Sequence, residues 1–297
     1  MDRREFLRAS ALTTLVPLLG ACGDDKPTTG TFPTPSPGTA LENVGLGRAR
    51  GLQVIDAEAE LIVGASRYAF GLLDPNGAPV TDATVRVYVG RSASAPPITV
   101  VSATQLREGV GDKALYVAKV PFPQDGDWLV AVTADTSEDA GLVGGTRVTV
   151  KKSSKSPMPG QRAISVATPT TAAPGGADPL CSRNPVCSMH TLSLDAALRN
   201  GKPTVVTFSA PAFCQTEVCG PVVDIVDRIG KERADAMNFI HVEAYRQRGK
   251  VLAPALTGWK FDSEPWTYFI DKVGIVSDRI SGALGAEEVT ERVSALA

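Results

Sequence analysis

The residues of this chain whose types and spacing could do chemistry are five cysteines: Cys22, Cys181, Cys187, Cys214 and Cys219. Cys214 and Cys219 follow the apolar residues 203–208, which predict a buried strand, and precede residues 222–229, whose apolar spacing predicts a helix. A thiolate near a helix N-terminus is stabilised by unpaired N–H groups and by the helix dipole. The lower thiol pKa that results favours thiol–disulfide exchange. We therefore expect Cys214 to be a nucleophile and Cys219 the resolving thiol.

The spacing of this pair limits where its members can lie. Four residues separate Cys214 from Cys219. On one regular helix their Cα atoms would lie about 8.5 Å apart, beyond the about 7 Å that a disulfide allows. Cys214 therefore either precedes the helix or bonds to Cys219 only after the first turns unwind. Pro221 favours the first arrangement, because proline is favoured in the opening turn of a helix. An unreactive structural disulfide and metal binding are the other uses of such a pair.

The first residues have the composition of an export signal. Arg3 and Arg4 precede an apolar run at residues 9–21, which is shorter than the about 20 residues that cross a bilayer. The arginine pair resembles a twin-arginine signal, and Leu-Gly-Ala-Cys at residues 19–22 resembles a bacterial lipobox. This resemblance implies lipidation of Cys22. It places the protein in the cell envelope, anchored by lipid on the extracytoplasmic side of the membrane.

The other two cysteines predict a structural feature of an exported protein. Disulfides persist outside the cytoplasm, and Cys181 and Cys187 enclose only five residues. We expect them to form a structural disulfide at the start of the C-terminal domain. The chain has two histidines, His190 and His241, which are too few for a three-histidine site. We expect no bound metal and no cofactor beyond the two reactive thiols.

Composition divides the chain into five segments. Residues 1–21 form the predicted signal peptide, residues 22–50 a Pro/Thr/Gly-rich tether, and residues 152–180 a Pro-rich linker. Residues 51–151 contain short β-branched runs between turn residues, which predict a sandwich of about seven strands. Residues 181–297 show strand, helix, strand, a hairpin and a final helix in order. The mature chain therefore has two predicted domains.

Overall composition excludes some classes of protein. The chain has 297 residues, 30 of them basic and 32 acidic, and 43% are hydrophobic. This length suffices for two domains with their own cores, and the apolar content excludes wholesale disorder. A net charge of −2 argues against a nucleic-acid partner. We expect Trp128 to lie in the core of the first domain.

Two segments resemble known families. Pro-Val-Thr-Asp-Ala-Thr-Val at residues 79–85, with Gly-Asp-Trp at 126–128, resembles bacterial immunoglobulin-like domains. In the last segment, the element order and Ser-Glu-Pro-Trp-Thr-Tyr-Phe-Ile-Asp at residues 263–271 resemble the thioredoxin-like superfamily. The resemblances imply a fold class of two domains: an all-β immunoglobulin-like sandwich followed by an α/β thioredoxin-like fold.

The thioredoxin-like resemblance also implies an activity. It implies a cis peptide bond before Pro265, with the backbone of Glu264 pairing with a bound substrate next to Cys214 and Cys219. The implied protein is a membrane-anchored thiol–disulfide oxidoreductase that acts on exported proteins or small thiols. Its partners would be those thiols and disulfides, together with the lipid bilayer that it reaches through Cys22.

Three alternatives remain open at this point. The Cys-x4-Cys segment also resembles that of atypical two-cysteine peroxiredoxins, although Pro211 and Pro265 stand where a hydroxyl residue and an arginine would orient peroxide. A copper-delivery protein would bind Cu(I) through Cys214, Cys219 and either His241 or His190. A non-catalytic scaffold would use both cysteine pairs as structural disulfides.

Overall fold

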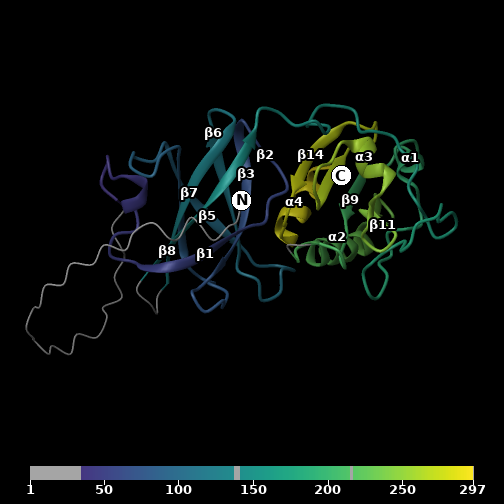
Figure 1. Cartoon of the computed structure of the whole chain (residues 1–297). Helices are drawn as coiled ribbons and strands as arrows, with labels where there is room; N and C mark the ends of the chain where they lie inside the picture. Colours follow the sequence, from purple (N-terminus) through teal and green to yellow (C-terminus); the bar gives the residue numbers. More distant parts are fainter. Residues whose placement is uncertain (1–34, 137–140, 215–216, 297) are drawn as a thin grey trace, which may run out of the picture.

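The structure is a computed structural model that describes residues 35–136, 141–214 and 217–296. Its strands and helices form two units that lie side by side, the first purple to teal and the second green to yellow (Figure 1). The predicted export signal and Cys22 lie outside the described residues, as does the first part of the predicted tether. Among the described residues, no helix is both long and apolar enough to cross a membrane.

The first unit is built from strands that alternate inward and outward side chains. They are β1 (Ala49–Asp56), β2 (Leu61–Ile62), β3 (Gly64–Leu73), β4 (Thr84–Gly90), β5 (Thr99–Leu106), β6 (Leu115–Phe122), β7 (Gly126–Asp135) and β8 (Leu142–Lys151). The order in the sheet is β1-β3-β6-β5-β4-β7-β8-β2, and β1 also pairs with β8. That extra parallel pairing, which begins at Ala49 and Leu142, closes seven strands into a barrel.

The interior of the barrel follows from the period-2 pattern. Tyr68, Phe70 and Leu72 alternate along β3 and are buried, as a strand with one face to the core requires. Phe122 and Trp128 pack edge to face, with ring centroids 5.6 Å apart. Trp128 is 1% exposed, which confirms the prediction that it is a core residue.

The second unit has a four-stranded sheet with helices on both faces and a separate two-stranded sheet. Its elements are α1 (Leu194–Ala197), β9 (Thr204–Ser209), α2 (Cys219–Arg233), β10 (Asn238–Glu243), β11 (Tyr245–Arg246), β12 (Val251–Leu252), α3 (Pro254–Trp259), β13 (Trp266–Ile270), β14 (Val276–Ser281) and α4 (Ala286–Leu296). The order of the four-stranded sheet is β10-β9-β13-β14; β10 runs parallel to β9, and the other neighbours are antiparallel. The two-stranded sheet consists of β11 and β12. One apolar cluster lies between the sheet and α2 and α4, and another lies between the sheet and α1 and α3.

The expected fold class is wrong. The pairing of β1 with β8 closes the strands into a barrel, which excludes a sandwich of two separate immunoglobulin-like sheets. The sequence did not distinguish the two folds, because inward and outward residues alternate along the strands of both. The described chain is mostly β, and two of its four α-helices have six residues or fewer. It therefore forms no clear α/β thioredoxin-like domain.

The two proline-rich segments are partly packed where the structure describes them. In the predicted tether, a 3-10 helix (Leu41–Asn43) places Leu41 and Val44 against Tyr88 of the barrel. In the predicted linker, residues 152–180 form no helix and no extended strand, but they join the second unit through an isolated bridge at Arg162 and through further backbone hydrogen bonds. Ala163 in this segment donates its N–H to the carbonyl of Gly274 and is buried.

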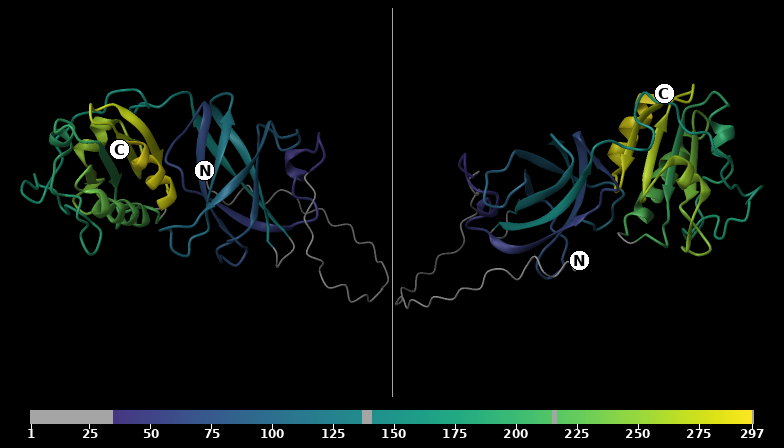
Figure 2. Two further views of the ribbon diagram at one scale, coloured as in Figure 1. Left: turned by 180° about the vertical axis from the view of Figure 1, so that it is seen from behind. Right: turned by 45° about the horizontal axis from the view of Figure 1, so that its top comes forward.

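The barrel and the second unit share an interface. Ala57, Leu106 and Val110 of the barrel belong to the same apolar cluster as α2 and α4, and α4 lies on the side of the second unit that faces the barrel (Figures 1 and 2). The backbone approaches closely at Gly282, where an added Cβ would lie 2.0 Å from the carbonyl oxygen of Ala57. Only glycine fits this position, which also has a φ of +79°.

Candidate functional site

The predicted redox pair lies where β9 leads into α2. All six residues of β9 are buried, and the chain turns after it through hydrogen bonds from the N–H groups of Phe213 and Cys214 to the carbonyl of Ala210, at 2.9 and 3.0 Å. Cys219 is the first residue of α2. Cys214 therefore precedes the helix, which is the first of the two arrangements that the spacing allowed.

The two sulfurs have different surroundings. Cys214 is half-buried, whereas Cys219 is 0% exposed. Their Sγ atoms and a carboxylate oxygen of Glu264 all lie within 4.8 Å of one another. The hydrogen bond from Cys219 to Cys214, together with burial, raises the pKa of the Cys219 thiol. Cys219 therefore holds its proton, which leaves the half-buried Cys214 as the sulfur of the pair that a substrate can reach.

Glu264 adds an ionisable group to this site. Burial and then the nearby charge of Cys214 raise the pKa of the Glu264 carboxyl. The hydroxyl of Tyr245 donates to Glu264 Oε2 at 3.0 Å, and burial with the charge of Glu264 raises the pKa of Tyr245 to about 12. The Glu264–Pro265 peptide bond is cis, as the sequence predicts. The structure thus brings together the four predicted residues Cys214, Cys219, Glu264 and Pro265.

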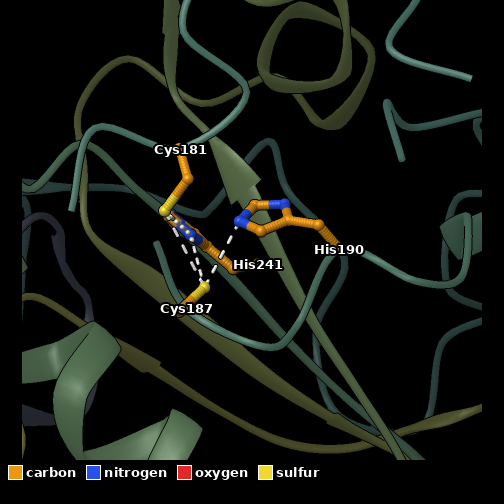
Figure 3. Close-up of side chains that lie close together, drawn as sticks. All are labelled: Cys181, Cys187, His190 and His241. Carbon is orange, nitrogen blue, oxygen red and sulfur yellow. Dashed lines mark hydrogen bonds between the residues drawn. The ribbon is translucent and has the colours of Figure 1, made fainter. Parts of the chain in front are cut away.

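A second cluster contains the other two cysteines and both histidines. Cys181, Cys187, His190 and His241 point toward one another from the segment before α1 and from β10 (Figure 3). The Sγ of Cys187 lies 3.3 Å from His190 Nε2 and 3.4 Å from His241 Nδ1. The Sγ of Cys181 lies 3.6 Å from His241 Nδ1. All four residues are buried.

The predicted disulfide between Cys181 and Cys187 is not formed in this cluster. Their Sγ atoms lie 3.8 Å apart, and each sulfur also faces an imidazole nitrogen. The hydrogen bond between the two thiols lowers the pKa of Cys181 and raises that of Cys187. The sequence pairs His190 or His241 with Cys214 and Cys219, whereas the structure places both histidines beside Cys187. The Cys-x5-Cys-x2-His spacing of residues 181–190 is a signal that could have found His190, but His241 has no such signal.

Hydrogen bonds link the two clusters. Ser182, beside Cys181, accepts through Oγ from the N–H of Ala212 at 3.0 Å. His241 Nε2 lies 3.2 Å from the carbonyl oxygen of Ser209, and Ser209 Oγ donates to the carbonyl of Cys219 at 3.2 Å. The loop that carries Cys214 is therefore held at both ends by residues bonded to the cysteine–histidine cluster.

Comparison with known proteins gives low similarity throughout. No family model matches the chain, and no curated protein matches it. Among solved structures, a protein described as thiol:disulfide interchange protein DsbE from Chlorobium tepidum is similar to 48% of this chain and 99% of its own, with 14% identity and a TM-score of 0.32. CopC from Methylosinus trichosporium is similar to 35% of this chain and 97% of its own, with 12% identity and a TM-score of 0.25. At these values neither assigns a fold or an activity to the chain.

Proposed function

We propose that the protein is a thiol–disulfide oxidoreductase whose reactive pair is Cys214 and Cys219. The observation that carries the proposal is the asymmetry of the pair. A half-buried sulfur lies beside a fully buried sulfur whose pKa is raised, and the buried sulfur belongs to the first residue of a 15-residue helix. A thiolate is the attacking species in exchange, and a second thiol within reach resolves the mixed disulfide.

The reaction follows from the positions of these groups. The Cys214 thiolate attacks one sulfur of a substrate disulfide; a Cys214–substrate bond forms, and the other substrate sulfur leaves as a thiolate. Cys219 then transfers its proton to Glu264, whose raised pKa favours accepting it. The Cys219 thiolate attacks Cys214 and releases the second substrate sulfur. The substrate disulfide is reduced to two thiols as the pair becomes a disulfide, and the reverse sequence oxidises a dithiol.

The same proposal includes the place of the protein and its substrates. Export by the twin-arginine signal and lipidation of Cys22 would hold the protein on the extracytoplasmic side of the membrane, where residues 22–50 connect it to the lipid. In that compartment exported proteins form disulfides. The proposed substrates are therefore exported proteins or small thiols.

The other candidate activities need groups that the described residues of the site do not bring together. Pro211 and Pro265 offer neither the hydroxyl nor the guanidinium that would orient peroxide at Cys214. The histidine expected to complete a copper site with Cys214 and Cys219 is bonded elsewhere, since His190 and His241 both contact Cys187. These contacts favour exchange chemistry at Cys214 over both alternatives.

The experiment that tests the proposal is trapping of the reaction intermediate. The mature chain is mixed with a disulfide-bonded peptide, and the adducts are identified by mass spectrometry. We expect Cys219→Ser to accumulate a mixed disulfide at position 214 and Cys214→Ser to form none. A peptide of the same sequence with serine in place of each cysteine is the matched control, because it has no disulfide to exchange. Equal adduct formation by Cys214→Ser and wild type would overturn the proposal.

A further inference from the structure

We propose that Cys181, Cys187, His190 and His241 bind one zinc ion in a closed site, separate from the reactive pair. The four side chains are 1–7% exposed, and their ligand atoms lie within 4.8 Å of one another. Two thiolates and two imidazoles form one of the usual donor sets of structural zinc sites.

The distances in the cluster are those of a tetrahedral site. Zinc–sulfur bonds of about 2.3 Å and zinc–nitrogen bonds of about 2.0–2.1 Å place two sulfurs about 3.8 Å apart, and a sulfur and a nitrogen about 3.6 Å apart. The two Sγ atoms lie 3.8 Å apart, and three of the four sulfur–nitrogen distances are 3.3, 3.4 and 3.6 Å. A zinc ion therefore fits between the four atoms with little movement of the side chains.

The charge of the ligand set selects the ion. Two thiolates carry a charge of −2, and two neutral imidazoles add none. A divalent ion makes the buried group neutral, whereas Cu(I) leaves a net negative charge away from water. Because an uncompensated buried charge is costly, the site favours zinc over Cu(I).

The surroundings orient the ligands for this role. His241 Nε2 donates to the carbonyl of Ser209 at 3.2 Å, which leaves the lone pair of Nδ1 directed at both cysteines. His190 presents Nε2 to Cys187, and its Nδ1 is buried and has no partner among the described residues. Ser188, next to Cys187, is fixed to Asp227 of α2 by its N–H at 2.8 Å and its hydroxyl at 2.6 Å.

The site would fix the segment before α1 to the sheet. Cys181, Cys187 and His190 lie in that segment, which forms no helix or strand, and His241 lies in the middle of β10. Because four protein ligands occupy all four positions around a tetrahedral zinc ion, no coordination position remains for a substrate. We therefore assign the ion a structural role: it orders residues 181–190 and, through Ser182 and Ser209, the loop that carries Cys214.

The test measures zinc in the full mature chain. The protein carries no polyhistidine tag and is purified with a reductant that does not chelate metals. We expect one zinc per chain by elemental mass spectrometry. Zinc affinity should fall by about tenfold or more in His241→Ala and in Cys187→Ala. Loss of a hydrogen-bond partner of a ligand already lowers metal affinity by about tenfold, and each of these variants removes a ligand itself. Cys214→Ala and Cys219→Ala are the matched controls and should retain the ion.

A ligand variant that fails to fold does not end the test, because X-ray absorption at the zinc edge examines the wild-type chain. We expect a first shell of two sulfurs and two nitrogens. A shell without sulfur would overturn the proposal, and so would zinc lost in Cys214→Ala but kept in His241→Ala. A Cys181–Cys187 disulfide in protein reconstituted with zinc under reducing conditions would also overturn it.

Discussion

Arg67 connects the barrel to the second unit and provides a sharp test of their interface. From β3 its guanidinium donates to Glu288 of α4 at 2.7 and 2.8 Å, to Glu58 at 3.1 Å and to the carbonyl of Ala283 at 2.6 Å. The side chains of Glu58 and Glu288 are 2% and 13% exposed. Replacement of Arg67 by methionine keeps an apolar stem and removes every donor.

The expected loss follows from the charge left behind. Burial raises the pKa of Glu58 to about 8, so this carboxyl is largely protonated at neutral pH. Burial is the largest influence on the pKa of Glu288 and acts to raise it, but the hydrogen bond and charge of Arg67, with the Gly285 N–H and the charge of Arg292, together lower it. Arg67→Met therefore leaves the Glu288 carboxylate without its partner, and removing one member of a buried ion pair costs about 3–5 kcal/mol.

Urea unfolding measures this loss in each unit separately. Trp128 reports on the barrel, and Trp259 and Trp266 report on the second unit. We expect the free energy of unfolding to fall by about 3–5 kcal/mol in Arg67→Met. It should recover in part when Glu288→Gln is added, because the stranded charge is then gone.

Two results would refute this reasoning. One is a loss below about 1 kcal/mol in Arg67→Met, which is the range of a surface ion pair. The other is a double variant no more stable than the single one, which would mean that the Glu288 charge is not the source of the loss.

Three further changes have defined outcomes. The folded-state pKa of Glu58, about 8, lies above its ordinary 4.5, so the stability that its protonation contributes is complete below pH 4.5 and is lost as the pH rises through 8. Between these pH values the urea midpoint should therefore fall less in Glu58→Gln than in the wild type. An equal fall of the midpoint in both proteins would contradict this. Gly282→Ala should lower the thermal midpoint more than Gly77→Ala. Both glycines have a positive φ, but an added Cβ would lie 2.0 Å from a backbone oxygen at Gly282 and would meet nothing within 4 Å at Gly77. Equal shifts of the midpoint would count against the close contact at Gly282. Cys219→Ala should slow alkylation of Cys214 near neutral pH by about tenfold or more, because a hydrogen bond to a charged group contributes about 1.5–3 kcal/mol; an unchanged rate would show that Cys219 does not stabilise the thiolate.

Local patterns predicted the individual elements better than their assembly. The apolar residues 203–208 form a strand within one residue of the predicted bounds, because a continuous apolar run suits a strand buried on both faces. Closure of the barrel was not predictable in this way. It depends on pairing between β1 and β8, which are far apart in the chain, and the inward–outward alternation is the same in a sandwich.

The candidate site shows the same division. Cys214 and Cys219 follow β9, Glu264 and Pro265 precede β13, and the four come together because the start of β13 pairs with the end of β9. The cysteine–histidine cluster depends on His241, which lies within a buried strand and has the sequence context of an ordinary core histidine. His241 reaches the segment with the other three residues of the cluster by a contact between distant parts of the chain, in which its N–H donates to the carbonyl of Met189 at 3.0 Å.

The most direct test of the central claim is a redox titration of the mature chain in glutathione buffers, with disulfides mapped by mass spectrometry. The account predicts one two-electron transition in which a bond forms between Cys214 and Cys219, and no such transition in Cys214→Ser. A chain in which Cys214 stays a thiol, or pairs only with glutathione across the whole range of buffers, would contradict it.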